Sequence, residues 1–113
     1  MAEHIVILST CAGEAEARNL AGALLEGHLA ACVNVLPGCQ SFYRWKGAIE
    51  ESHEWLLLIK SSRAQFAAVT AAIEAAHSYE VPEVIALPII DGSTNYLNWL
   101  RANLGPGGRL GEP

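Results

Sequence analysis

The stretch IEESHEWLLLIK, from Ile49 to Lys60, contains the pattern that decides the fold. Its second half, Trp55–Ile59, is an unbroken apolar run, so Leu57 faces one side of a strand while Leu56 faces the other. The run His4–Thr10 (HIVILST) has the same character. Strands that are apolar on both faces are typical of sheets that are covered on both sides.

Outside this stretch, helical and extended periodicities alternate along the chain. In chain order, the first half is predicted to form a strand over 4–10, a helix over 14–27 and extended segments over 31–36 and 41–45. The second half is predicted to form a strand over 49–60, a helix that begins after Ser62 and ends near His77, a strand over 83–90 and a helix over 94–104. Pro37-Gly38 predicts a bulge, Lys46-Gly47 a hairpin turn, and Ser62 with Gln65 a capping box.

This order, βαββαβ, predicts an α+β protein: a ferredoxin-like sandwich with a short C-terminal helix. We expect one domain over 1–104 and a flexible tail over 105–113. The helices of such a sandwich cover one face of the sheet, and the rest of the chain is too short to cover the other. A second copy of the chain is therefore the expected cover, and the protein is expected to be a homo-oligomer.

Composition limits the partners and the compartment. The 113 residues include 7 Lys and Arg and 12 Asp and Glu, a net charge of −5. That balance disfavours nucleic acids and anionic membrane surfaces, and no apolar run is long enough to span a bilayer. The 3 cysteines form no even set, and the N-terminus has no basic region, so we expect a cytoplasmic protein with reduced thiols.

Catalytic motifs of the common enzyme classes are missing from the sequence. It contains no phosphate-binding glycine loop, no nucleophile elbow and no dinucleotide-binding glycine motif. We therefore expect a protein that is not an enzyme.

Two residues are candidate metal ligands. Cys11 ends the first predicted strand and His77 ends the second predicted helix, and together they would suit copper or zinc. Each also has a structural interpretation: Cys11 as a small buried residue at a strand end, and His77 as a residue favoured at a helix C-terminus by the dipole.

A small-molecule cleft is the second candidate site. Tyr43, Trp45 and Glu50 lie in the densest polar and aromatic stretch, which is typical of pocket walls and equally of a hairpin that clasps a neighbouring subunit. The two interpretations are compatible if the pocket lies between subunits. The predicted cleft also includes three residues at element ends: Lys60, Tyr79 and Glu83.

The ordered set of short motifs resembles the CutA1 divalent-cation tolerance family over nearly the whole chain. The motifs are STC at 9–11, LAACVN at 29–34 with PG at 37–38, SxYxWxG at 41–47, LxxK at 57–60, YEVPE at 79–83 and YLxWL at 96–100. The resemblance implies a ferredoxin-like subunit in a homotrimer, a role in tolerance to copper or other divalent cations, and an architecture shared with PII signalling trimers, which bind small effectors between subunits. A PII-like ligand cleft is therefore the alternative function.

The resemblance also implies a copper site in some relatives. Its ligands are a Cys near the end of the first strand and a His pair that closes the second helix. Those positions hold Ser9, Ala76 and His77 here, so only His77 matches. Cys11 lies two residues after Ser9, on the same side of the strand, and is the candidate replacement.

Overall fold

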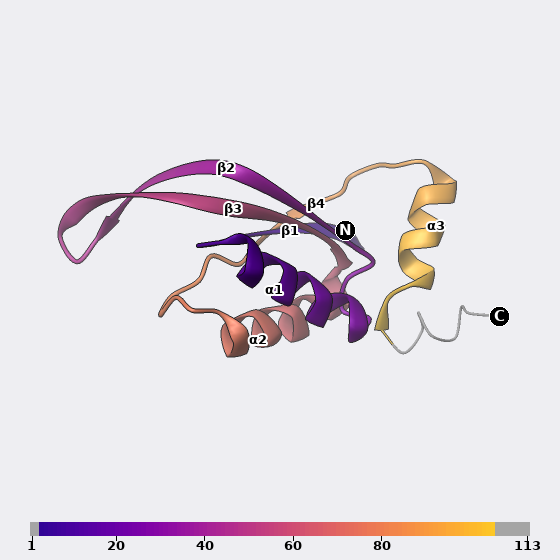
Figure 1. The fold of residues 1–113 in the computed structure, drawn as a ribbon. Helices are drawn as coiled ribbons and strands as arrows, with labels where there is room; N and C mark the ends of the chain where they lie inside the picture. Colours follow the sequence, from indigo (N-terminus) through magenta and orange to yellow (C-terminus); the bar gives the residue numbers. More distant parts are fainter. Residues whose placement is uncertain (1–2, 106–113) are drawn as a thin grey trace.

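The computed structural model describes residues 3–105, which form a four-stranded antiparallel sheet with three α-helices (Figure 1). The elements are β1 (His4–Cys11), α1 (Glu14–Glu26), β2 (Cys32–Trp45), β3 (Ala48–Ser62), the 3₁₀ turn η1 (Arg63–Gln65), α2 (Phe66–Ala76), β4 (Ile85–Pro88) and α3 (Thr94–Ala102). The strands lie in the order β2-β3-β1-β4. The predicted sequence of strands and helices is confirmed.

The hydrophobic core lies between the sheet and the two helices α1 and α2, which lie side by side below it in Figure 1. Alternate residues of the two central strands point into this layer because strand side chains alternate between faces. The strands contribute Ile7, Leu57 and Ile59, and each is fully buried. From the helices, Leu20 of α1 and Ile73 of α2 close the core.

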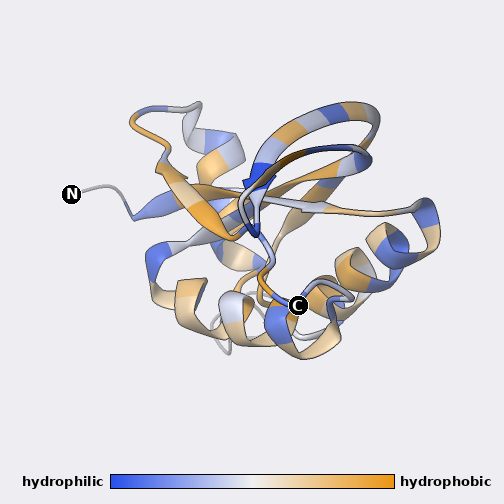
Figure 2. Ribbon diagram, turned by 90° about the vertical axis from the view of Figure 1, so that its left-hand side faces the viewer, coloured by the Kyte–Doolittle hydropathy of each residue, from blue (hydrophilic) through white to orange (hydrophobic). Residues whose placement is uncertain are grey.

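The opposite face of the sheet is apolar and open to solvent. We call it the open face; it consists of Val6, Leu8, Leu36, Leu56, Leu58, Ile85 and Leu87. Exposed fractions reach 50% for Ile85 and 49% for Leu87. Figure 2 shows hydrophobic residues, in orange, along the strands. The second apolar face predicted from the sequence is therefore present, and none of the described helices covers it as α1 and α2 cover the other face.

Strands β2 and β3 extend beyond β1 as a two-stranded ribbon, residues 39–54 (Figure 1). The register shifts between Leu36 and Cys39, where Gly38 has φ +81°, so the predicted bulge is confirmed. At the tip, Lys46 and Gly47 both have positive φ, as a two-residue hairpin turn requires. The ribbon lengthens the molecule to 50 × 26 × 23 Å.

Two predicted element ends are wrong. The capping box does not form, because β3 continues to Ser62 and neither Ser62 nor Gln65 caps a helix with its side chain. The last strand is shorter than predicted, since β1 pairs with it only over Ile85–Pro88. Gly105, the first residue of the expected tail, is buried and donates its N–H to the carbonyl of His28 at 2.6 Å. The rest of that tail lies outside the described residues.

None of the described helices is long and apolar enough to cross a membrane.

Candidate functional site

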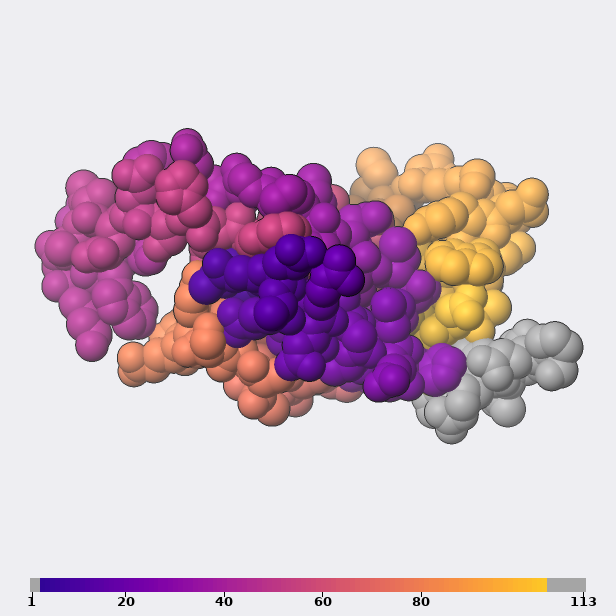
Figure 3. Space-filling view, in the orientation of Figure 1, coloured from indigo at the N-terminus to yellow at the C-terminus, as the bar shows by residue number. Residues whose placement is uncertain are grey.

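A cavity of about 680 Å³ lies between the ribbon and the segment that follows α2. Figure 3 shows the hollow at the left of the molecule, bounded by the ribbon and by the orange segment that follows α2. Its lining combines aromatic side chains, carboxylates, two aliphatic hydroxyl groups and one valine: Thr10, Ser41, Phe42, Tyr43, Trp45, Glu54, Tyr79, Glu80, Val81 and Glu83. Such a mixture of apolar walls and a few polar groups is typical of small-molecule sites.

One hydrogen bond joins the two sides of the cavity. The hydroxyl of Tyr79, on the segment after α2, donates to Oε2 of Glu54, on β3, at 2.6 Å. Glu54 retains 6% exposure. Burial raises the pKa of Tyr79, and the adjacent Glu54 carboxylate raises it further, so the phenol stays protonated as a donor at neutral pH.

A second carboxylate shares this environment. Partial burial raises the pKa of the Glu83 carboxyl, although the side chain is still in contact with solvent. The negative charge of Glu54 raises this pKa further. With Glu80, these carboxylates make the cavity lining acidic.

Four of the six residues predicted for a ligand cleft line this cavity: Tyr43, Trp45, Tyr79 and Glu83. The remaining two, Glu50 and Lys60, do not. Glu50 pairs with Tyr43 across the ribbon but is exposed outside the lining. Lys60 lies toward the other end of β3, where its ammonium group donates to the side chain of Asn34.

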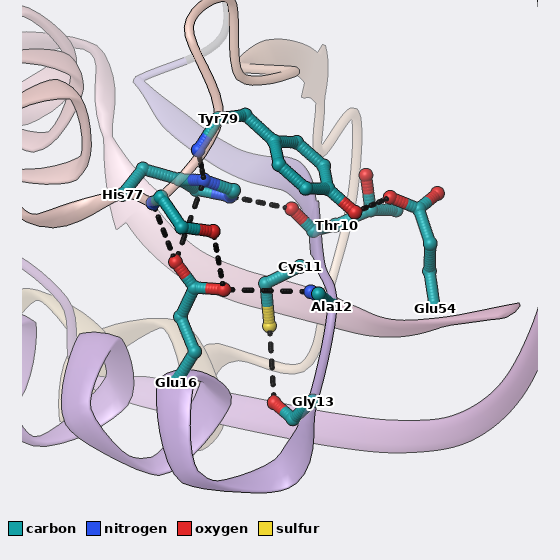
Figure 4. A network of polar contacts seen from close by, with 9 residues as sticks. Thr10, Cys11, Ala12, Gly13, Glu16, Glu54, His77 and Tyr79 are labelled. Atoms are coloured by element: carbon teal, nitrogen blue, oxygen red, sulfur yellow. Dashed lines mark hydrogen bonds and ion pairs between the residues drawn. The ribbon is translucent and has the colours of Figure 1, made fainter. Parts of the chain in front are cut away.

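His77 lies in a polar network beside the cavity and is hydrogen-bonded to two of its lining residues, Thr10 and Tyr79 (Figure 4). Its Nδ1 accepts a hydrogen bond from the backbone N–H of Tyr79 at 3.0 Å. The other ring nitrogen, Nε2, lies 2.7 Å from the carbonyl oxygen of Thr10, so Nε2 carries the proton and donates it. The imidazole side chain has 0% exposure. Both nitrogens of the predicted metal ligand are thus engaged with the backbone.

Glu16 of α1 completes the network. Its carboxylate accepts from the N–H and the hydroxyl of Ser78, at 2.6 and 3.0 Å, and lies 3.6 Å from Nδ1 of His77. Burial alone would raise the pKa of Glu16, but the hydrogen bonds that its carboxylate accepts, chiefly the two from Ser78, act in the opposite direction, and the pKa is lowered overall.

Cys11, the second predicted metal ligand, is fully buried, and its thiol donates to the carbonyl of Gly13 at 3.5 Å. Burial raises the pKa of this thiol, which disfavours the thiolate that metal ions bind. Within residues 3–105, no three His, Cys, Asp or Glu side chains lie close enough together to hold a metal ion. The residues present therefore do not form a preformed metal centre.

Sequence reasoning missed the central residue of the cavity, Glu54, and the residue that anchors the network, Glu16. Glu54 is the last acidic residue before the apolar run of β3, and that position is its sole signal in the sequence. Glu16 reads as an ordinary acidic residue in the first turn of a helix. Their partners, Tyr79 and Ser78, are 25 and 62 residues away in the sequence, so local patterns could not find them.

Comparison with known proteins agrees over most of the chain. The model of the CutA1 divalent ion tolerance protein family matches residues 5–103. The divalent-cation tolerance protein CutA of Thermus thermophilus is 48% identical over 100 residues, which are 88% of this chain and 97% of that protein. Its counterpart from Yersinia pestis (strain Pestoides F) is 45% identical over 88% of this chain and 84% of its own length.

Solved structures show the same similarity. The Cut A1 structure from Thermus thermophilus has a TM-score of 0.89 at 47% identity, covering 90% of this chain and 99% of that one. CutA1 from Oryza sativa gives 0.89 at 40% identity, with 93% and 96% covered. A CutA from Archaeoglobus fulgidus, described as periplasmic, gives 0.86 at 38% identity, with 88% and 97% covered. The chain belongs to the CutA1 divalent ion tolerance protein family.

Proposed function

We propose that this protein contributes to divalent-cation tolerance as a ligand-binding protein, and that the cavity beside the ribbon holds its ligand. The cavity carries the proposal: its volume of about 680 Å³ falls within the range of roughly 300–1,000 Å³ of small-molecule sites. Its lining combines apolar walls with a few polar groups, as is usual for sites that bind small molecules.

We further propose that the working form is a homotrimer of ferredoxin-like subunits, with a PII-like arrangement of ligand clefts between subunits. The order of elements and the strand order β2-β3-β1-β4 support the topology. The apolar open face supports the assembly, because a large exposed apolar patch marks an interaction surface. The ribbon supports it too: Phe42 and Ile49 are 66% and 70% exposed, and an isolated two-stranded ribbon is marginally stable in water.

The test of the ligand site is an amide NMR titration with metabolite-sized compounds. We expect shifts centred on Thr10, Ser41, Tyr43 and Tyr79, and we expect Tyr43→Ala to weaken binding. Tyr96→Ala is the matched control, because both tyrosines are 42% exposed and Tyr96 does not line the cavity. Shifts centred elsewhere, or equal effects of the two substitutions, would contradict the proposal.

Weak Cu(II) binding by His77 and Cys11 is the second candidate. The observation that favours it is that both residues lie in the region drawn in Figure 4, near the carboxylate of Glu16. Binding requires His77 to release a backbone partner and Cys11 to release Gly13, so low affinity is expected. Native mass spectrometry with Cu(II) tests it: His77→Ala should lose copper that the unaltered chain retains.

We also propose a cytoplasmic location. Its support is that Cys11, Cys32 and Cys39 are all free cysteines, as is usual in reducing compartments. The relative from Archaeoglobus fulgidus is described as periplasmic, so cell fractionation of the native host is the deciding measurement. Recovery with periplasmic markers would contradict the proposal.

A further inference from the structure

The cavity holds negative charge without a positive partner. Three carboxylates line it, from Glu54, Glu80 and Glu83, and no Lys, Arg or His is among its described lining residues. Glu54 is 6% exposed, and the Tyr79 hydroxyl is the one hydrogen-bond donor that the structure gives it within residues 3–105. Taking an unpaired carboxylate out of water is unfavourable, so a cation that enters the cavity is stabilised.

Geometry disfavours a bare metal ion as that cation. The lining carboxylates do not converge into a cluster of three metal-ligating side chains anywhere in the described chain. A cavity of about 680 Å³ is also far larger than the coordination shell of one ion. The charge is spread over a roomy site, and this arrangement suits a larger organic ion.

The aromatic side chains indicate how the rest of that ion is held. Phe42, Tyr43, Trp45 and Tyr79 line the cavity beside the carboxylates. Aromatic faces attract cations and pack against apolar groups. The ring of Trp45 already makes a cation–π contact within the chain, with Nζ of Lys46 at 5.7 Å from the ring centroid.

We infer that the cavity binds a protonated organic amine, with its ammonium group against Glu54 and its apolar body against the aromatic side chains. The inference rests on the proposed function, because it names the ligand class of the same cavity. An ammonium N–H donor matches the second oxygen of Glu54, which accepts no hydrogen bond from the described residues. Glu80 and Glu83 add long-range attraction. A lysine from a second copy of the chain offers the same chemistry, so the test separates the two sources.

The test is calorimetric titration of the full chain with three probes of equal size: benzylammonium, benzyl alcohol and benzoate. We expect benzylammonium to bind about tenfold or more tightly than the other two. Glu54→Gln keeps the shape of the side chain and an acceptor for Tyr79 but removes the charge. It should lower benzylammonium affinity about tenfold and leave benzyl alcohol affinity unchanged. Glu50→Gln, on the exposed part of the same ribbon, is the matched control. Thermal unfolding of each variant checks that it is folded.

Each remaining outcome overturns the inference. If the three probes bind alike, or if Glu54→Gln binds benzylammonium as the unaltered chain does, the amine class is wrong, while amide shifts in the cavity would still support the proposed function. If benzylammonium does not bind and Glu54→Gln reduces the size of the assembly in native mass spectrometry, a second copy supplies the cation. If no probe binds at millimolar concentration and the assembly is unchanged, the cavity has no preference for amines.

Discussion

The imidazole of His77 joins the backbone of Tyr79 to that of Thr10, which lies 67 residues before the histidine: Nε2 donates to the carbonyl of Thr10 at 2.7 Å while Nδ1 accepts from the N–H of Tyr79. This pair of bonds holds the segment after α2 against the end of β1. The same segment carries Tyr79, whose hydroxyl reaches Glu54 across the cavity. The buried histidine thus positions one wall of the candidate site.

Replacing His77 with alanine should destabilise the fold. The substitution leaves the carbonyl of Thr10 and the N–H of Tyr79 without their partner, and we expect the free energy of unfolding to fall by about 1–3 kcal/mol. Urea unfolding followed by circular dichroism measures the change. His53→Ala is the control, because His53 is exposed, and its effect should stay within about 0.5 kcal/mol. Equal losses in the two variants would show that the bonds of His77 contribute little.

Glu16 should make stability depend on pH in the acid range. Its pKa is lower in the folded chain than in the unfolded one, so its ionised form stabilises the fold. That contribution is fully present above the unfolded pKa of about 4.3 and is lost as pH falls through the folded pKa. Glu16→Gln should therefore lower the melting temperature near neutral pH and flatten the acid limb of the stability profile.

Glu14→Gln serves as the comparison for that profile, because Glu14 is in the same turn of α1 and its side chain is 54% exposed. Its pairing with Arg18 is a surface ion pair of the kind that contributes little. A profile for Glu16→Gln that runs parallel to that of the unaltered chain would contradict the assignment.

The Tyr79–Glu54 bond should stabilise the cavity wall. Tyr79→Phe removes the one described donor to a carboxylate with 6% exposure, and the expected loss is about 1.5–3 kcal/mol in the free energy of unfolding. Combining it with Glu54→Ala, which removes the acceptor of the bond, in a double-mutant cycle isolates the pair. Tyr96→Phe, at a tyrosine that is 42% exposed, should have little effect. A coupling energy near zero in the cycle would mean that the two residues act independently.

The open face should carry the assembly. Leu87→Glu places a charge on this face, where Leu87 is 49% exposed, and burying that charge between copies would be strongly unfavourable. If the proposed trimer forms through this face, the variant should shift toward monomers in light scattering after gel filtration. Leu25→Glu is the matched control, since Leu25 is 41% exposed on α1, away from the open face. A trimer that persists in Leu87→Glu would place the interface elsewhere.

The elements and the two apolar faces could be predicted from the sequence because they depend on local periodicity. The run Trp55–Ile59 predicted a strand with two apolar faces, and the structure buries Leu57 while leaving Leu56 on the open face. Element ends were less predictable. The start of α2 depends on how far β3 stays paired with β1, which is a long-range property, and that pairing continues to Ser62.

The candidate site also combines residues that local sequence indicates with residues that only long-range contacts reveal. Tyr43 and Trp45 could be selected from the sequence because aromatic and polar residues are concentrated there, and both line the cavity. Glu54 could not, since its importance comes from Tyr79 on another segment and from its burial. His77 could be identified as a special residue, but the engagement of both its ring nitrogens depends on the position of Thr10 in space.

By itself, the sequence determined the family, the order of strands and helices and the presence of a second apolar face. These follow from motifs and from side-chain alternation, which a linear chain already contains. Only the tertiary structure decided which carboxylate is removed from water, which tautomer His77 adopts and where the cavity lies. Those properties depend on desolvation and on hydrogen bonds between segments far apart in the chain, as between Glu54 and Tyr79.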